Sequence, residues 1–483
     1  MNKRYQFAAL ALVASLLLNA CRMGKDYQRP EMKLPDTYRD QDQAADSAGM
    51  AAIQWNDFFR DSLLQKIIDT ALVYNHDMQK AYTNIRIADQ QVRQGKAQYL
   101  PEVDATIASM NRQFRSENFY SGPTAKYYEE TGKTAPENMY TYTPQNISSI
   151  SLSWELDIWG KIGRQNEATF ARYLQTDEAR KLLQTQLIAN IAEGYYNLLM
   201  LDAQLLVARR NLQLSDSTLR MVKLQRDAGQ LTSLAIQQTE SQLLEAASLI
   251  PQLKKQIAIQ ENSISLLAGQ YPDSVRRADA FREFIADSIE AGVPLYMVGN
   301  RPDVRAAELE LRAANAEVGV AQAYRYPTLT IDATGGVNSM LASDWVNVPG
   351  SLFGSLLGSI TQPVFSRRKL KTRYEISKLE REKAELDFQQ TVLKAVTEIS
   401  GTLATLENLE QEFEIAERRV EVAQLGTKQA GMLFKAGLAT YLEVINAQRN
   451  AISSELNLVS VQQQLVLARV ELYRALGGGW KKT

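Results

Sequence analysis

The sequence predicts a membrane-associated α+β protein built from two tandem structural repeats, and three observations support this fold class. The chain of 483 residues aligns with itself at a nearly constant offset. Four segments alternate apolar and polar residues with a period of two, as strands with two different faces do. Long segments after them repeat apolar residues every seven positions, as coiled coils do. Each repeat should therefore contain a helix, two strands and two long helices.

The internal repeat is the clearest of these observations. Residues 77–101 align without a gap to residues 303–327 at an offset of 226, and residues 228–240 align to residues 436–448 at an offset of 208. The difference places an insertion after Pro101, in the tyrosine-rich segment 118–144. The predicted organisation comprises a signal peptide (1–20), an N-terminal segment (21–60), a first repeat (61–270), a linker (271–300), a second repeat (301–476) and a tail (477–483).

Period-two alternation predicts strands at residues 103–109, 150–158, 329–337 and 356–364. Strands of about ten residues can cross a bilayer when tilted. Glu155, Asp157 and Asp332 fall on the polar face, which would line a lumen. Four strands are too few to close a barrel, so several chains would have to share one. The alternative is a small soluble sheet packed on helices.

Seven-residue spacing predicts very long helices in both repeats. One helix over residues 160–228 would be about 100 Å long, and Pro251 should bend the helix that follows. The first repeat carries its apolar series at Ile191, Leu198, Leu205, Leu212 and Leu219. The second carries it at Ile399, Leu406, Phe413 and Val420. These series predict antiparallel coiled-coil hairpins.

A glycine interrupts each long helical segment at the same place in the repeat. Gly229 and Gly437 are suited to end a helix because glycine adopts positive φ without strain. Thr232 and Thr440 follow as candidate N-caps of the next helix. The alternative is a glycine kink inside one continuous helix, which would then be implausibly long.

The N-terminus predicts a lipoprotein. Residues 1–4 are basic, residues 7–18 are apolar, and "LNAC" at residues 18–21 resembles a bacterial lipobox. Cys21 would then carry acyl chains such as palmitate and anchor the mature chain in lipid, with about 0.8 kcal/mol for each buried methylene. An ordinary signal peptide with a spare thiol is the alternative reading.

Composition argues against several classes of function. The formal net charge of −1 shows no bias toward nucleic acid. His76 and Cys21 are the only histidine and cysteine, too few for a usual zinc or iron site. No nucleophile–base pair or glycine-rich phosphate loop stands out. We therefore expect no enzyme activity, metal or cofactor.

Five motifs, in order along the mature chain, resemble the outer membrane factor (TolC-like) family, in particular its lipoprotein efflux branch (NodT-type). They are "QWNDFFRDSLLQKIIDTALVYNHDMQKA" (54–81), "WELDIWGKI" (154–162), "GNRPDV" (299–304), "QPVFSRRK" (362–369) and "YRALGGGW" (473–480). The resemblance implies a homotrimer with a shared 12-stranded β-barrel and a periplasmic α-barrel. It also implies docking to a periplasmic adaptor and an inner-membrane resistance–nodulation–division (RND) pump.

The resemblance further implies a passive exit duct, closed at the periplasmic tips of the hairpins, residues 228–234 and 436–442. The family's gate positions fall on Glu443 and Asn446, which predicts a ring of three glutamates; a merely solvated Glu443 is the alternative. Ala439 and Ala235 stand where an ionic latch would need charges, so no such latch is expected. A duct for protein secretion and a non-channel coiled-coil envelope lipoprotein are the competing functions. The sequence does not indicate the substrate.

Overall fold

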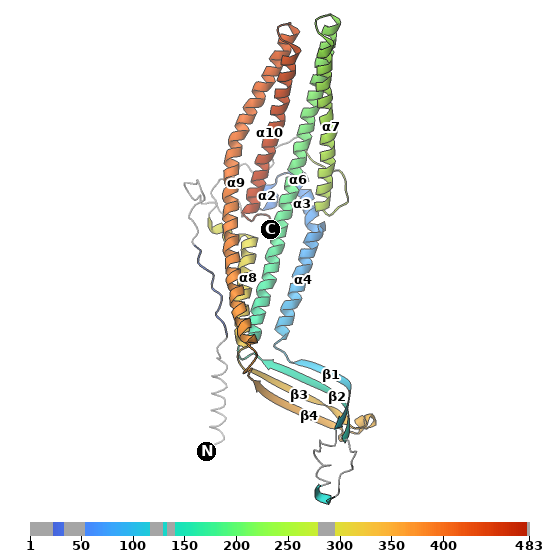
Figure 1. Ribbon diagram of the computed structural model, residues 1–483, viewed down its shortest axis with the longest axis vertical. Coiled ribbons are helices and arrows are strands. Elements are labelled where there is room, and N and C mark those ends of the chain that lie inside the picture. The colour runs from blue at the N-terminus through green and yellow to red at the C-terminus, as the bar shows by residue number, and fades with distance from the viewer. Residues whose placement is uncertain (1–22, 33–53, 116–128, 133–140, 279–294, 481–483) are drawn as a thin grey trace. The chain divides into compact units, whose positions relative to one another are not determined.

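The computed structural model describes residues 23–32, 54–115, 129–132, 141–278 and 295–480, and its elements are labelled in Figure 1. In chain order they are α2 (Trp55–Phe58), α3 (Ser62–Tyr74), α4 (His76–Ala97), β1 (Glu102–Arg115), β2 (Thr141–Leu156), α6 (Lys161–Asp227), α7 (Ser233–Leu267), η2 (Leu295–Asn300), α8 (Pro302–Ala323), β3 (Thr328–Ser339), η3 (Ala342–Val346), β4 (Leu352–Thr361), α9 (Lys369–Lys435) and α10 (Tyr441–Ala475). The chain thus combines long helices with one four-stranded sheet.

Two compact units make up the chain. The strand unit takes Met1–Gln28, Asp89–Ala171 and Arg312–Glu382, and the helical unit takes Arg29–Ala88, Arg172–Leu311 and Lys383–Thr483. Each unit draws on both halves of the sequence. The repeat is therefore a duplication in sequence whose copies are shared between the two units.

Element lengths confirm the duplication. α4 and α8 have 22 residues each, α6 and α9 have 67 each, and α7 and α10 have 35 each. The strands differ, because β1 and β2 have 14 and 16 residues while β3 and β4 have 12 and 10. Part of the predicted insertion therefore lengthens the first strand pair, and most of segment 118–144 lies outside the described residues.

The strand unit contains an antiparallel sheet in the order β1-β2-β3-β4. Its register puts apolar residues in line across the sheet: Leu152 pairs with Val103 and Ala333, and Ala333 pairs with Leu356. The alternate row is polar in β2 and β3, where the Ser153 hydroxyl donates to the Asp332 carboxylate at 2.7 Å, but Leu357 of β4 lies in the same row. The sheet therefore has two chemically different faces, as the alternation predicted.

The described residues of one chain leave the apolar face of this sheet largely uncovered. Leu356 and Ile360 of β4 are 78% and 73% exposed, and Val103 of β1 is 60% exposed. An isolated exposed apolar side chain is ordinary, but a row of them along paired strands marks an interaction surface. The described helices include none with the length and apolarity of a membrane-spanning segment.

Several predicted strand ends are wrong: β1 continues past residue 109 to Arg115, β2 begins at Thr141 rather than at residue 150, and both β2 and β4 end earlier than predicted. β2 stops at Leu156 rather than Ile158, because the Asp157 carboxylate accepts from the backbone N–H groups of Ile162 and Gly163, both at 2.9 Å. Asp157 is thus a cap of α6 and does not lie on the polar strand face. β4 runs from Leu352 to Thr361 rather than over 356–364. Pro363 lacks the backbone N–H that the strand ladder needs.

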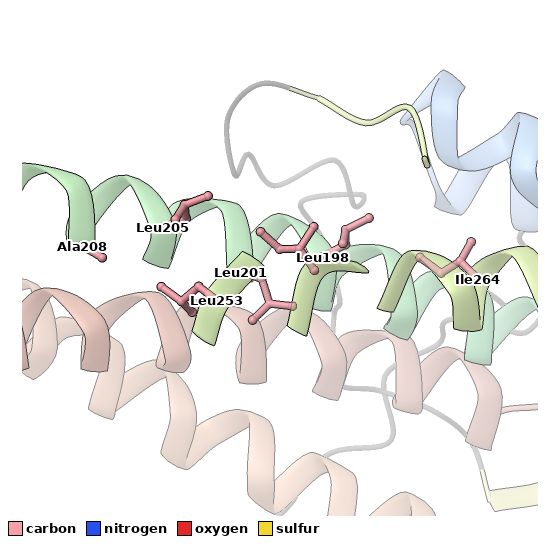
Figure 2. Close-up of a cluster of buried hydrophobic side chains, with 7 residues drawn as sticks. Leu198, Leu201, Leu205, Ala208, Leu253 and Ile264 are labelled. Carbon is pink, nitrogen blue, oxygen red and sulfur yellow. The ribbon is translucent and has the colours of Figure 1, made fainter. Parts of the chain in front are cut away.

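Most of the predicted heptad positions are buried in the core of the helical unit, but Leu212, Phe413 and Val420 are only partly buried. Figure 2 shows one part of it, where Leu198, Leu201 and Leu205 of α6 pack near Leu253 and Ile264 of α7. Ile191 and Val222 of α6 are fully buried as well. α7 continues through Pro251 to Leu267. Burial of this stripe is the main stabilising contribution to helices whose exposed faces are polar.

Both long hairpins turn in the same way. α6 ends at Asp227 and α9 at Lys435, followed by Gly229 at φ 76° and Gly437 at φ 73°. In each turn the glycine N–H bonds to the carbonyl three residues back, and the next N–H bonds to the carbonyl five residues back. This is the Schellman motif, which satisfies carbonyls at a helix end. Neither glycine lies within a continuous helix.

An ionic cluster joins α8, α9 and α10 in the helical unit. Arg301, 5% exposed, contacts both carboxylate oxygens of Asp303 at 3.0 and 2.8 Å and the Glu398 carboxylate at 2.7 Å. Glu398 also accepts from Arg474, and Arg301 donates to the Ala475 carbonyl at 2.5 Å. Burial alone would lower the pKa of Arg301, but the hydrogen bond and charge of Asp303 and the charge of Glu398 raise it.

We predict that Glu398→Ala destabilises the helical unit by about 2 kcal/mol, because two arginines would face each other without the shared carboxylate. The value lies below that of a fully buried pair because the Glu398 side chain is 28% exposed. Thermal unfolding followed by far-ultraviolet circular dichroism measures the loss. Glu412→Ala, on an exposed position of α9, is the control and should leave the melting curve unchanged. Equal effects of both variants would contradict the assignment.

A second prediction concerns the turn of the second hairpin. Gly437→Ala should destabilise the protein by about 1 kcal/mol, because an L-residue is strained at positive φ although nothing lies within 4 Å of the added methyl group. Gly431→Ala, inside α9 and also with open space, should stabilise by about 0.5–1 kcal/mol. Melting temperatures that move in opposite directions would support the turn; a shift in the same direction would not.

Candidate functional site

Glu443 forms a capping box at the tip of the second hairpin. Its Oε2 accepts from the backbone N–H of Thr440 at 2.6 Å and from the Thr440 hydroxyl at 3.2 Å. Thr440 is the N-cap of α10, with extended backbone angles. The pattern Thr-x-x-Glu at the start of a helix is a sequence signature of this motif. Sequence reasoning identified Thr440 as a cap but missed the part that Glu443 plays.

The side chains of Glu443 and Asn446 are exposed, whereas Val444 and Ile445 between them are 2% and 6% exposed. The carboxylate therefore lies off the seam that packs α10 into the hairpin bundle. This orientation leaves it free to meet solvent or another subunit while it caps the helix.

The first hairpin has no acid at the matching position. Ala235 is fully buried in a cluster with Val222, Phe434 and Val444. A carboxylate there would lose its hydration inside an apolar cluster, which is costly. Thr232 is the N-cap of α7, but its side chain makes no capping hydrogen bond. The two tips therefore share a backbone turn but differ in charge and capping.

Polar contacts near this cluster connect the two hairpins. Tyr441 donates from its hydroxyl to Gln238 Oε1 at 2.6 Å, and Arg449 donates from Nε to Gln242 Oε1 at 2.8 Å. Gln448, 3% exposed, donates to the Thr218 hydroxyl at 2.8 Å. Sequence reasoning missed these contacts because one sequence does not show which helix faces meet. These hydrogen bonds join α10 to α6 and α7. None of them involves Ala439 or Ala235, the two positions where an ionic latch would need charges.

Cys21 lies outside the described residues, but Met23 and Gly24 are hydrogen-bonded to Arg164 in the strand unit. Arg164, 1% exposed, donates from Nε to the Met23 carbonyl at 2.9 Å and from Nη2 to the Gly24 carbonyl at 3.1 Å. Gly24 has φ 84°, and a Cβ there would lie 2.7 Å from Gly319 Cα. Both the positive φ and the close approach to Gly319 therefore exclude a side chain at position 24.

The described residues contain no group of three or more His, Cys, Asp or Glu side chains that could hold a metal ion. The Tyr195 hydroxyl donates to Asp61 Oδ2 at 2.5 Å. Burial and this carboxylate raise the pKa of Tyr195, so the phenol stays protonated and continues to donate.

The chain resembles known proteins over almost its full length. It is 26% identical to the cation efflux system protein CusC of Escherichia coli, over 98% of this chain and 99% of the relative. It is also 26% identical to the toluene efflux pump outer membrane protein TtgF of Pseudomonas putida, over 98% of this chain and 96% of the relative. Both alignments leave no large part of either protein unmatched.

A solved structure shows the same fold. A membrane protein from Pseudomonas aeruginosa superposes with a TM-score of 0.84 at 24% identity, covering 95% of this chain and 98% of that chain. The family model described as outer membrane efflux protein matches residues 67–270 and 297–478. These two stretches contain the sheet, both hairpins and the Arg301 cluster. The chain therefore belongs to the outer membrane efflux protein family.

Proposed function

We propose that the protein is the outer membrane channel of a tripartite efflux system, a passive exit duct with no chemistry of its own. The observation that carries this proposal is the uncovered apolar face of the four-stranded sheet. Apolar residues face outward from a transmembrane barrel, and polar residues such as Asp332 face the lumen. The long helices would continue the duct into the periplasm.

The sheet also needs partners at its edges. Within one described chain, β1 pairs only with β2, and β4 pairs only with β3. Unpaired backbone N–H and C=O groups cannot be left in lipid, since each costs several kcal/mol. In a homotrimer, β4 of one chain would pair with β1 of the next and close a 12-stranded barrel. The family's name and the efflux functions of CusC and TtgF support this use.

The remaining parts of the system follow from this assignment. The tips around Gly229 and Gly437 would meet a periplasmic adaptor, which would connect the duct to an inner-membrane RND pump. Residues 1–20 would be removed as a signal peptide and Cys21 acylated. The tight packing of Met23 and Gly24 supports a fixed attachment point close to the strand unit. Relatives of equal similarity are named for cations and for toluene, so no substrate is assigned.

A pair of lysine substitutions tests the membrane assignment of the sheet. Leu356→Lys places a charge on the apolar face of β4, and we expect a cost of about 2–4 kcal/mol if that face meets lipid. Ser355→Lys, on the neighbouring exposed position of the opposite face, should be tolerated. Outer membrane content of folded trimer and conductance in planar bilayers are the measurements. Normal assembly of Leu356→Lys would mean that the sheet is not lipid-exposed.

Glu443 variants test the gate. We infer that three copies of this carboxylate ring the pore at the periplasmic tip, where they would favour cations. Glu443→Gln keeps an acceptor for Thr440 and removes the charge, while Glu443→Ala removes both. We expect both variants to weaken the block of single-channel current by multivalent cations. Only the alanine variant should also lower the melting temperature, because it loses about 1 kcal/mol of capping energy from the free energy of unfolding. Unchanged cation block in both variants would assign Glu443 to capping alone.

A further inference from the structure

The connection from β4 to α9 exposes apolar and cationic side chains together. Val364 and Phe365 are 93% and 87% exposed. Arg367, Arg368, Lys369 and Lys371 follow, all of them exposed. We call these six residues the junction surface. The 18 residues from Thr361 to Lys378 contain six cations and one carboxylate, Glu375, so the region is strongly positive.

Three of the four cations of the junction surface have no carboxylate partner among the described residues. Glu375 forms an ion pair with Lys378 at 2.6 Å, and its other cationic neighbours, Lys371 and Arg325, are not hydrogen-bonded to it. No carboxylate of the described residues pairs with Arg367, Arg368 or Lys369. A surface whose charges find no internal partner is complementary to an anionic one.

The first repeat shows that this surface is not required by the turn itself. At the offset of 208 that relates α6 to α9, Arg368 corresponds to Gly160 and Phe365 to Asp157. Gly160 has φ 70° and Arg368 has φ 66°, so an arginine in the second copy adopts the left-handed backbone that glycine adopts in the first, and Arg367 beside it has φ 48°. An arginine is strained there, and strain persists where other interactions compensate it. The second copy has also replaced a helix-capping carboxylate by an exposed aromatic ring.

Neighbouring tyrosines hold further cations in place. The guanidinium of Arg373 lies 4.0 Å from the ring centre of Tyr324, and that of Arg325 lies 5.2 Å from the ring centre of Tyr374. Tyrosine rings with a polar edge are typical of the boundary between lipid and water. These stacked pairs order cationic side chains beside the junction surface.

We propose that the junction surface binds anionic phospholipid headgroups where β4 leaves the membrane. Val364 and Phe365 would enter the acyl-chain region, and Arg367, Arg368, Lys369 and Lys371 would contact headgroup phosphates. This inference rests on the proposed function, because it requires β4 to lie in a bilayer. A cation near an anionic membrane surface strengthens binding about fivefold, so the pair Arg367 and Arg368 would contribute about 25-fold at low salt.

The test is a lipid titration of the purified full-length protein in detergent. Phosphatidylglycerol should raise the melting temperature of the wild type more than phosphatidylcholine does, and added salt should reduce the difference. The double variant R367G/R368G should need about 25-fold more phosphatidylglycerol for the same shift. Without lipid it should remain trimeric and melt at the wild-type temperature or higher, since glycine relieves the strain at positive φ.

Matched variants identify the cause of any change. K394A/K428A removes two exposed cations from α9 outside the junction surface and should respond to phosphatidylglycerol as the wild type does. A wild-type response in R367G/R368G would overturn the proposal, and so would loss of its trimer in lipid-free detergent, which would make the surface a subunit contact. Wild-type pores without a preference for phosphatidylglycerol refute this inference alone. A wild type that forms no pore refutes the proposed function.

Discussion

Backbone hydrogen bonding at the two edges of the sheet constrains everything else in this molecule. β1 and β4 each have one neighbouring strand within the described chain, and both belong to a sheet with an exposed apolar face. In water such edges invite uncontrolled pairing, and in lipid they cannot be left open. In the proposed trimer, pairing between neighbouring chains would complete the hydrogen-bond ladder, and the bilayer would cover the apolar face.

The helical unit contains two helices of 67 residues, which need a source of stability along their whole length. Helix propensity contributes little over such a length compared with the packing of one apolar stripe. α6 carries that stripe through Ile191, Leu198 and Val222, all fully buried. Ionic contacts around Arg301 then hold the C-terminal end of α10 near the start of α8. Hydrophobic packing thus aligns the helices along their length, and charge pairing joins their ends.

Much of this fold can be predicted from the sequence because its signals are periodic and occur twice. Heptad spacing located α6 and α9 to within a residue or two at the breaks, and the repeat related one copy to the other. The errors occurred where a single side chain decides the outcome. Asp157 reads as an alternating strand residue but caps α6 through two backbone N–H groups. Pro363 ends β4 earlier than the apolar pattern suggests.

The candidate site was less accessible to sequence reasoning for a related reason. Glu443 could be located by resemblance, and its Thr-x-x-Glu spacing was available to be read. Contacts such as Tyr441 with Gln238 join residues 203 positions apart in the chain and depend on which helix faces meet. Periodicity shows that a face is buried, but not which face of another helix covers it. A single sequence without an alignment contains no signal for that choice.

The near-identical turns at Gly229 and Gly437 have a consequence for symmetry. In the proposed trimer, six hairpin tips with the same backbone would surround the axis, an arrangement with approximate sixfold symmetry. Only three of them carry the capped carboxylate of Glu443, and the other three carry the buried methyl group of Ala235. The backbone therefore repeats every sixth of a turn, while the charge repeats every third. A partner that recognises the backbone shape of the tips would find six equivalent positions on this ring. A partner that binds through the charge of Glu443 would find three.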